Sequence, residues 1–171
     1  MKTKIHFDSG AWLSTEKIPL DGHITPHISW NEYSNPSSSA EYQCEIWPES
    51  LIHAKISEDI RNGWVKHKNI PEDQGVVINS MFRTEEFNSR PEVGGDPKSL
   101  HLHGCASDFL FGYLSDADWQ WLVNFVGDLQ KKYNTQMELG RYDWGAHAGS
   151  FIEKWNPYTT VKLYLFDRRT R

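Results

Sequence analysis

The chain has 171 residues, of which 38% are hydrophobic and 24% are charged, and its formal net charge is −5 at pH 7. This length suits one domain with a proper core, and no internal repeat or second block of composition interrupts it, so we expect a single domain over residues 1–171. The mild negative charge argues against a primarily nucleic-acid-binding protein, which would usually present a basic face. No stretch is apolar enough to span a bilayer, so we expect no membrane partner.

The first half of the chain contains one clear helix and one clear strand. Residues 1–47 show no clear helix or strand pattern, and their polar segments that contain proline and serine predict loops or turns. A helix is predicted over residues 48–66, because proline is tolerated in a first turn and isoleucines recur every four residues. His53 on this helix is expected at an exposed polar position. The β-branched run 76–78 predicts a buried strand that leads toward Arg83.

The second half contains three further predicted elements. Residues 105–114 predict a strand that carries alternating aromatic side chains. Residues 115–134 form the clearest helix of the sequence, because Ser115 can cap its first turn and its apolar residues form one stripe. Alternation over residues 161–166 predicts a last strand that closes the sheet.

Between these elements lies a segment, Ser99–Asp108, in which two imidazoles and a carboxylate stand within eight residues: His101, His103 and Asp108. Zinc sites with an open catalytic position typically take three His or carboxylate ligands and a water. His101 and Asp108 are seven positions apart, too far for adjacent turns of one helix. They can converge where the chain folds back at Gly104, which has no Cβ. The segment therefore predicts a metal site.

The pattern Ser-x-His-x-x-Gly-x-Ala-x-Asp over residues 99–108 resembles the zinc-binding signature of the D-alanyl-D-alanine carboxypeptidase and dipeptidase family. Residues 80–88 are similar to that family's Ser-x-x-Arg-x-x-x-x-Asn segment, and Val93–Gly95 to its Val-Gly-Gly. L-alanyl-D-glutamate endopeptidases and the hedgehog signalling domain share the fold. The resemblance implies an α+β domain in which helices flank a small antiparallel sheet. It also implies Zn²⁺ as the cofactor, although manganese or iron can occupy such a site.

The resemblance implies His101 and Asp108 as two metal ligands. The family's third ligand is a histidine on a late strand, and His147 is the only histidine after the motif, so we choose His147. The spacing departs from the family pattern, because Asp143 precedes His147 by four positions instead of three. A second alignment sets Glu153 at the ligand position, and a carboxylate can also bind zinc.

Other candidate residues would act on the substrate. Asp143 is our first candidate for the general base, with Glu153 and Glu138 as alternatives. Arg83 has a planar fork that can hold a carboxylate or a developing oxyanion. The alternative for Arg83 is a salt bridge to one of three nearby acidic residues, Glu85, Glu86 or Asp96.

Three polar residues around the motif complete the candidate site. We expect Ser99 and His103 to contribute to substrate binding beside Arg83. Ser99 and Asn88 also suit hydrogen bonds from side chain to backbone that would shape the loop. His103 is expected to be a neighbour of the site, with ligation of the metal as the less favoured alternative.

Together these features predict a metallopeptidase that hydrolyses peptidoglycan stem peptides through a zinc-activated water, at the D-Ala-D-Ala terminus or the L-Ala-D-Glu bond. The alternative is a catalytically inactive metal- or wall-binding module, or a phage structural protein, on the same fold. We expect a monomer whose partner is the peptidoglycan peptide. No secretory signal is visible, so we expect a protein that is cytoplasmic as synthesised, and a phage lysis system could release it to the wall.

Overall fold

The computed structural model describes residues 1–151 and 163–170. Its main sheet has five strands in the order β10–β8–β9–β7–β6. In that order the strands are Tyr164–Asp167, Met137–Tyr142, Gly145–Ser150, Ala106–Phe109 and Ile78–Ser80. Neighbouring strands are antiparallel except at one edge, where β10 runs parallel to β8. The predicted α+β fold with a small antiparallel sheet is therefore confirmed, with a parallel strand added at its edge.

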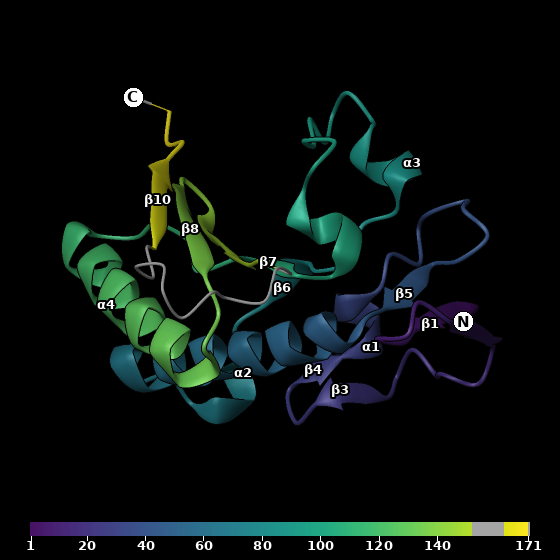
Figure 1. The fold of residues 1–171 in the computed structure, drawn as a ribbon. Helices are drawn as coiled ribbons and strands as arrows, with labels where there is room; N and C mark the ends of the chain where they lie inside the picture. Colours follow the sequence, from purple (N-terminus) through teal and green to yellow (C-terminus); the bar gives the residue numbers. More distant parts are fainter. Residues whose placement is uncertain (152–162, 171) are drawn as a thin grey trace.

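Two long helices, α2 (Pro48–Lys68) and α4 (Asp116–Tyr133), contact each other and lie beneath this sheet (Figure 1). Both were predicted, and the ends of α4 follow from local chemistry. The Ser115 hydroxyl accepts the N–H of Asp118 at the first turn, and Asn134 ends the helix in a left-handed conformation with φ 50°. Among the described residues, no helix has both the length and the apolar character needed to cross a membrane.

The first 47 residues, for which no clear element was predicted, form short strands. Three of them make a second sheet of order β2–β1–β5, with strands Trp12–Thr15, Thr3–His6 and Cys44–Ile46. Two more pair as a small hairpin, β3 (His23–Thr25) and β4 (Ile28–Ser29). Figure 1 places these strands at the end of α2 that lies farthest from β10. The remaining short elements are α1 (Trp30–Tyr33), η1 (Glu72–Gln74), α3 (Glu85–Asn88) and η2 (Leu100–His103).

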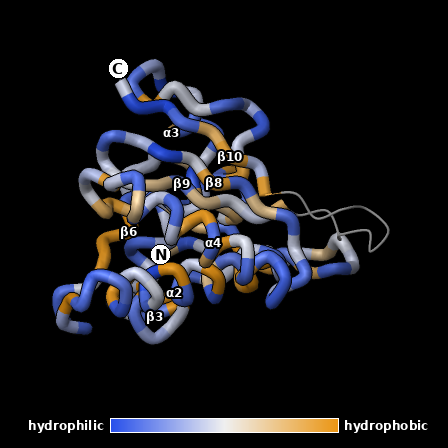
Figure 2. Tube along the Cα trace, turned by 90° about the vertical axis from the view of Figure 1, so that its left-hand side faces the viewer, coloured by the Kyte–Doolittle hydropathy of each residue, from blue (hydrophilic) through white to orange (hydrophobic). Residues whose placement is uncertain are grey.

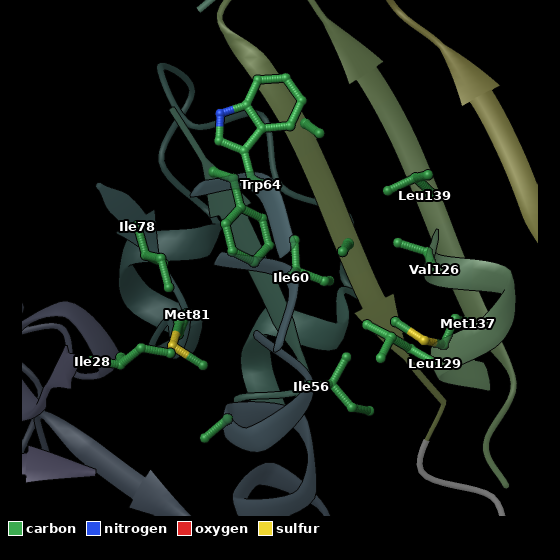
Figure 3. Packing of buried hydrophobic residues seen from close by; sticks show 14 of the residues in the cluster. Ile28, Ile56, Ile60, Trp64, Ile78, Met81, Val126, Leu129, Met137 and Leu139 are labelled. Atoms are coloured by element: carbon green, nitrogen blue, oxygen red, sulfur yellow. The ribbon is translucent and has the colours of Figure 1, made fainter. Parts of the chain in front are cut away.

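The core fills the layer between the main sheet and the two long helices. Ile60 from α2, Val126 from α4 and Leu139 from β8 are each at most 1% exposed, and Figure 3 shows these side chains meeting in this layer. The colours along α2 and α4 in Figure 2 change between polar and apolar, as expected of helices with one buried face. Full burial of each such side chain contributes about 1.5–3 kcal/mol. This layer occupies one face of the sheet and leaves the other face for a functional site.

His53 on α2 is fully buried, which corrects the exposed position expected from the sequence. Its ring nitrogens lie 2.9 Å from the Ser150 hydroxyl on β9 and 3.0 Å from the Ser107 hydroxyl on β7. Ser57, one turn along α2, is 2.7 Å from the same Ser107 oxygen. The sheet presents serines to α2 at this point, and buried polar groups need such partners. Burial lowers the pKa of His53 to about 3.

Candidate metal centre

The three residues chosen as metal ligands come together on the main sheet. His101 in η2, Asp108 on β7 and His147 on β9 each offer a ligand atom, and these atoms all lie within 4.8 Å of one another. Asp108 Oδ1 is 3.3 Å from His101 Nε2 and 2.9 Å from His147 Nδ1. Strand side chains alternate, and Ser107 contacts α2, so Asp108 points to the face that the long helices leave free.

Local structure explains how the motif reaches this geometry. The Ser99 hydroxyl accepts the His101 N–H at 3.3 Å, and Gly104 ends η2 with φ 63°, which turns the chain into β7. The expected reversal at Gly104 and the loop-shaping hydrogen bond of Ser99 are therefore confirmed. Asp108 and His147 stand directly opposite each other in the antiparallel pair of β7 and β9, so their side chains share one face.

His101 provides a direct test of whether these residues fit a metal ion. Its Nδ1 lies 2.7 Å from the Met81 carbonyl oxygen, which can only accept, so this nitrogen carries the proton. Its Nε2 is buried and has no hydrogen-bond partner among the described residues, although it lies beside Asp108. Ligand histidines commonly donate their other N–H to a backbone carbonyl in this way. Burial also lowers the pKa of His101, which favours the neutral ring that a metal requires. The site fits a divalent cation.

His147 lies between two carboxylates. Its Nδ1 is 2.9 Å from Asp108 Oδ1, and its Nε2 is 3.0 Å from Oε1 of Glu138 on β8. Burial by itself would lower the pKa of His147, but the hydrogen bonds to Asp108 and Glu138 raise it above its usual value. Glu138 was only an alternative in the sequence analysis. In the described part of the chain it is the carboxylate, besides Asp108, that touches this cluster.

Arg83 contacts the ligand set directly. One of its terminal nitrogens donates to Asp108 Oδ2, and its Nε donates to the Ser80 hydroxyl at 2.8 Å. Its ion-pair partner is therefore Asp108 itself, which differs from the three acidic residues that the sequence offered as alternatives. Burial alone would raise the pKa of Asp108, but His101 and His147 hold it well below its usual range. Asp108 is thus ionised, with one oxygen toward Arg83 and the other toward the histidines.

The structure does not bring Asp143 to this cluster. Asp143 is exposed in the turn between β8 and β9, and its carboxylate accepts hydrogen bonds from the Thr170 N–H and hydroxyl. Glu153, the alternative third ligand and base, lies outside the described residues. Among the carboxylates considered for the base, the structure therefore brings Glu138, within β8, to the cluster and keeps Asp143 away from it.

The two remaining candidates lie beside the cluster and do not enter it. His103 ends η2, and its ring packs edge-on against Trp47 at 5.2 Å between centroids. Asn88 donates to the Asp96 carbonyl at 2.9 Å, which confirms its expected role in shaping the loop. His103 therefore stays a candidate for substrate contact, and the ligand set excludes it.

Comparison with known proteins agrees with this site. A family model described as Peptidase M15 matches residues 42–132, more than half of the 171 residues. The match includes His101 and Asp108 but ends before β8, so Glu138 and His147 are placed by the geometry alone. No curated protein and no solved structure matches the chain. M15 peptidases depend on zinc in general, and the match confirms the resemblance seen in the motif. The chain therefore belongs to the M15 family of peptidases.

Proposed function

We propose that this protein is a zinc metallopeptidase that hydrolyses amide bonds of peptidoglycan stem peptides. The observation that carries the proposal is the convergence of ligand atoms from His101, Asp108 and His147, of which the buried His101 Nε2 has no hydrogen-bond partner among the described residues. Membership of the M15 family supports a peptidase. The D-Ala-D-Ala terminus and the L-Ala-D-Glu bond are the two candidate substrates.

Two imidazoles and one carboxylate form a donor set that zinc commonly uses. Zinc held there would act as a Lewis acid and lower the pKa of its water from ~15.7 to about 7. The chain's own contacts prepare the ligands for this role. Arg83 engages Asp108 Oδ2 and leaves Oδ1 facing the histidines, while Glu138 contacts Nε2 of His147.

Glu138 replaces Asp143 as our candidate for the general base. Its side chain is 25% exposed, so it can meet a substrate while it touches His147. In hydrolysis, the water oxygen bonds to the amide carbon while a water proton passes to Glu138. Glu138 then delivers this proton to the amide nitrogen as the C–N bond breaks. The guanidinium of Arg83 would stabilise negative charge on the carbonyl oxygen.

A pair of conservative variants tests this assignment. Glu138→Gln keeps an oxygen that can accept from His147 but cannot take a proton. With zinc-loaded protein and stem-peptide substrates, we expect Glu138→Gln to lower kcat at least about 100-fold. The matched Asp143→Asn variant should keep kcat close to that of the wild type. Loss of activity in Asp143→Asn alone would overturn the assignment of the base.

The same assay also separates the two functions that the sequence allows. Zinc-loaded wild-type protein that cleaves neither candidate bond would contradict the peptidase and favour the catalytically inactive binding module. Glu153→Gln belongs in the series as a third variant. If it alone abolishes turnover with zinc content unchanged, the base is Glu153 and the role given to Glu138 is wrong.

A further inference from the structure

The face of the sheet that carries the ligands continues to the edge strand β10. The register sets Phe166 beside Gly140, and Gly140 opposite His147, so the three residues form one row across the sheet. Gly140 has no side chain, and the Phe166 ring fills that space, because a Cβ at Gly140 would overlap the ring. The Phe166 and His147 ring centroids are 6.0 Å apart. The Phe166 ring therefore borders His147, the third proposed ligand.

Arg168 extends this face by one more row. Its N–H donates to the Arg141 carbonyl at 2.9 Å, so the chain after β10 keeps its alignment with β8. Alternation then places Arg168 on the same face as Phe166, with Asp167 and Arg169 on the other. The contacts agree: Arg168 Cζ lies 5.5 Å from the Phe166 ring centroid, whereas Arg169 pairs with Asp167 at 2.6 Å. The Arg168 guanidinium and the His147 ring therefore both lie beside the Phe166 ring.

Tyr142 shares the row of Arg168. Its ring stacks on Trp144 at 4.6 Å between centroids and meets the edge of Phe166 at 6.2 Å. The pKa of Tyr142 is raised chiefly by burial, and its hydroxyl also feels the charges of Arg168 and Asp108. Because Tyr142 and Arg168 both contact the Phe166 ring, Tyr142 brings a hydroxyl, which can donate a hydrogen bond, to the part of this face where Arg168 lies.

We propose that Arg168 and Tyr142 form a subsite that binds a substrate carboxylate, on the residue that supplies the leaving amine. The proposal rests on the proposed function. The terminal D-Ala ends in its α-carboxylate, and D-Glu, when linked onward through its side chain, carries a free α-carboxylate next to the amide nitrogen. Both candidate bonds therefore present the same chemical group at the same position.

The charges around the site explain why a second arginine is needed. Arg83 is engaged by Asp108, and the carboxylates of Asp108 and Glu138 would repel an anionic substrate. The fork of an arginine binds a carboxylate through two parallel hydrogen bonds, and Tyr142 can donate one more. One peptide residue spans at most about 3.6 Å, so a carboxylate on the leaving residue stays close to the cleaved bond. The His147 ring and Arg168 Cζ lie 6.0 Å and 5.5 Å from the Phe166 ring centroid, so the metal, the cleaved bond and the bound carboxylate would together have to reach along this ring.

The test compares Arg168→Gln with Arg169→Gln, which removes the same charge from the opposite face. The substrates are two N-acylated peptides, one ending in D-Ala-D-Ala and one containing L-Ala-D-Glu. Each peptide is also made in a second form, in which the α-carboxylate of the residue that supplies the leaving amine is replaced by an amide. Arg168→Gln should raise KM about tenfold for the cleaved carboxylate peptide with little change in kcat, and should not affect its amide. Arg169→Gln should match the wild type. The peptide whose KM rises in Arg168→Gln shows whether the bound carboxylate belongs to the terminal D-Ala or to D-Glu.

Binding without turnover keeps this test independent of the proposed function. On the zinc-loaded Glu138→Gln background, calorimetry gives Kd for the same four peptides with and without Arg168→Gln. A preference for carboxylate over amide that Arg168→Gln abolishes supports the subsite, even if the wild type cleaves neither peptide. Equal affinity for carboxylate and amide, or equal losses in Arg168→Gln and Arg169→Gln, would overturn it.

Discussion

Lowering the pH from about 7.5 to about 5 should destabilise the fold through His53. Burial lowers its pKa from 6.5 to about 3, so the folded ring stays neutral over a range in which the unfolded chain takes up a proton. The unfolded state then binds more protons, and stability falls as the pH drops from about 6.5 toward about 3. Each decrease of one pH unit in this range lowers the free energy of unfolding by about 1.4 kcal/mol. At about pH 5 the free energy of unfolding is therefore about 2 kcal/mol lower.

A His53→Gln variant isolates this effect, because its amide can still bond to the serines of β7 and β9 but does not titrate. Urea denaturation at both pH values gives the free energy of unfolding of each protein. We expect the wild type to lose about 2 kcal/mol more than the variant between the two pH values, since the other titrating groups are common to both. Equal losses would refute a buried, neutral His53. Should the variant not fold, an NMR titration decides: the wild-type His53 signal should not move between about pH 7 and about pH 4.

Three further substitutions probe the geometry of the site. Arg83→Lys keeps the charge but loses the planar fork, so kcat/KM should fall at least about tenfold at unchanged zinc content. Gly104→Ala adds a Cβ that overlaps the Tyr33 hydroxyl at a left-handed φ of 63°, and urea denaturation should show a loss of about 3 kcal/mol. The control Gly94→Ala, with φ 59° and open space around it, should lose only about 1 kcal/mol. Gly140→Ala should displace the Phe166 ring, which covers Gly140 and lies beside His147. We therefore expect this variant to bind zinc more weakly, as measured by competition with a chelator.

Elements with strong local signals could be predicted from the sequence. Helix α4 follows from the cap at Ser115 and its apolar stripe, and both ends were placed within one residue of those observed. The approach of His101 and Asp108 was predictable because both lie in one short segment and Gly104 permits the reversal between them. Local chemistry determines all of these features.

The partners that come from distant parts of the chain could not be predicted in this way. Glu138 reaches His147 because it pairs with Gly149, and a shift of one residue in that register would turn Glu138 to the other face. Asp143 is closer to His147 in sequence, yet it falls in the turn beyond the paired strands. The burial of His53 depends on serines 54 and 97 positions away, which no local pattern indicates.

Zinc content tests the central claim of a His101–Asp108–His147 metal centre most directly. Elemental analysis of purified, zinc-supplemented protein should be run in parallel on the wild type, His147→Ala and Glu153→Ala. The account predicts about one zinc per chain in the wild type, retained in Glu153→Ala and lost in a folded His147→Ala. Zinc retained in His147→Ala and lost in Glu153→Ala, or folded wild-type protein that binds no zinc, would contradict it.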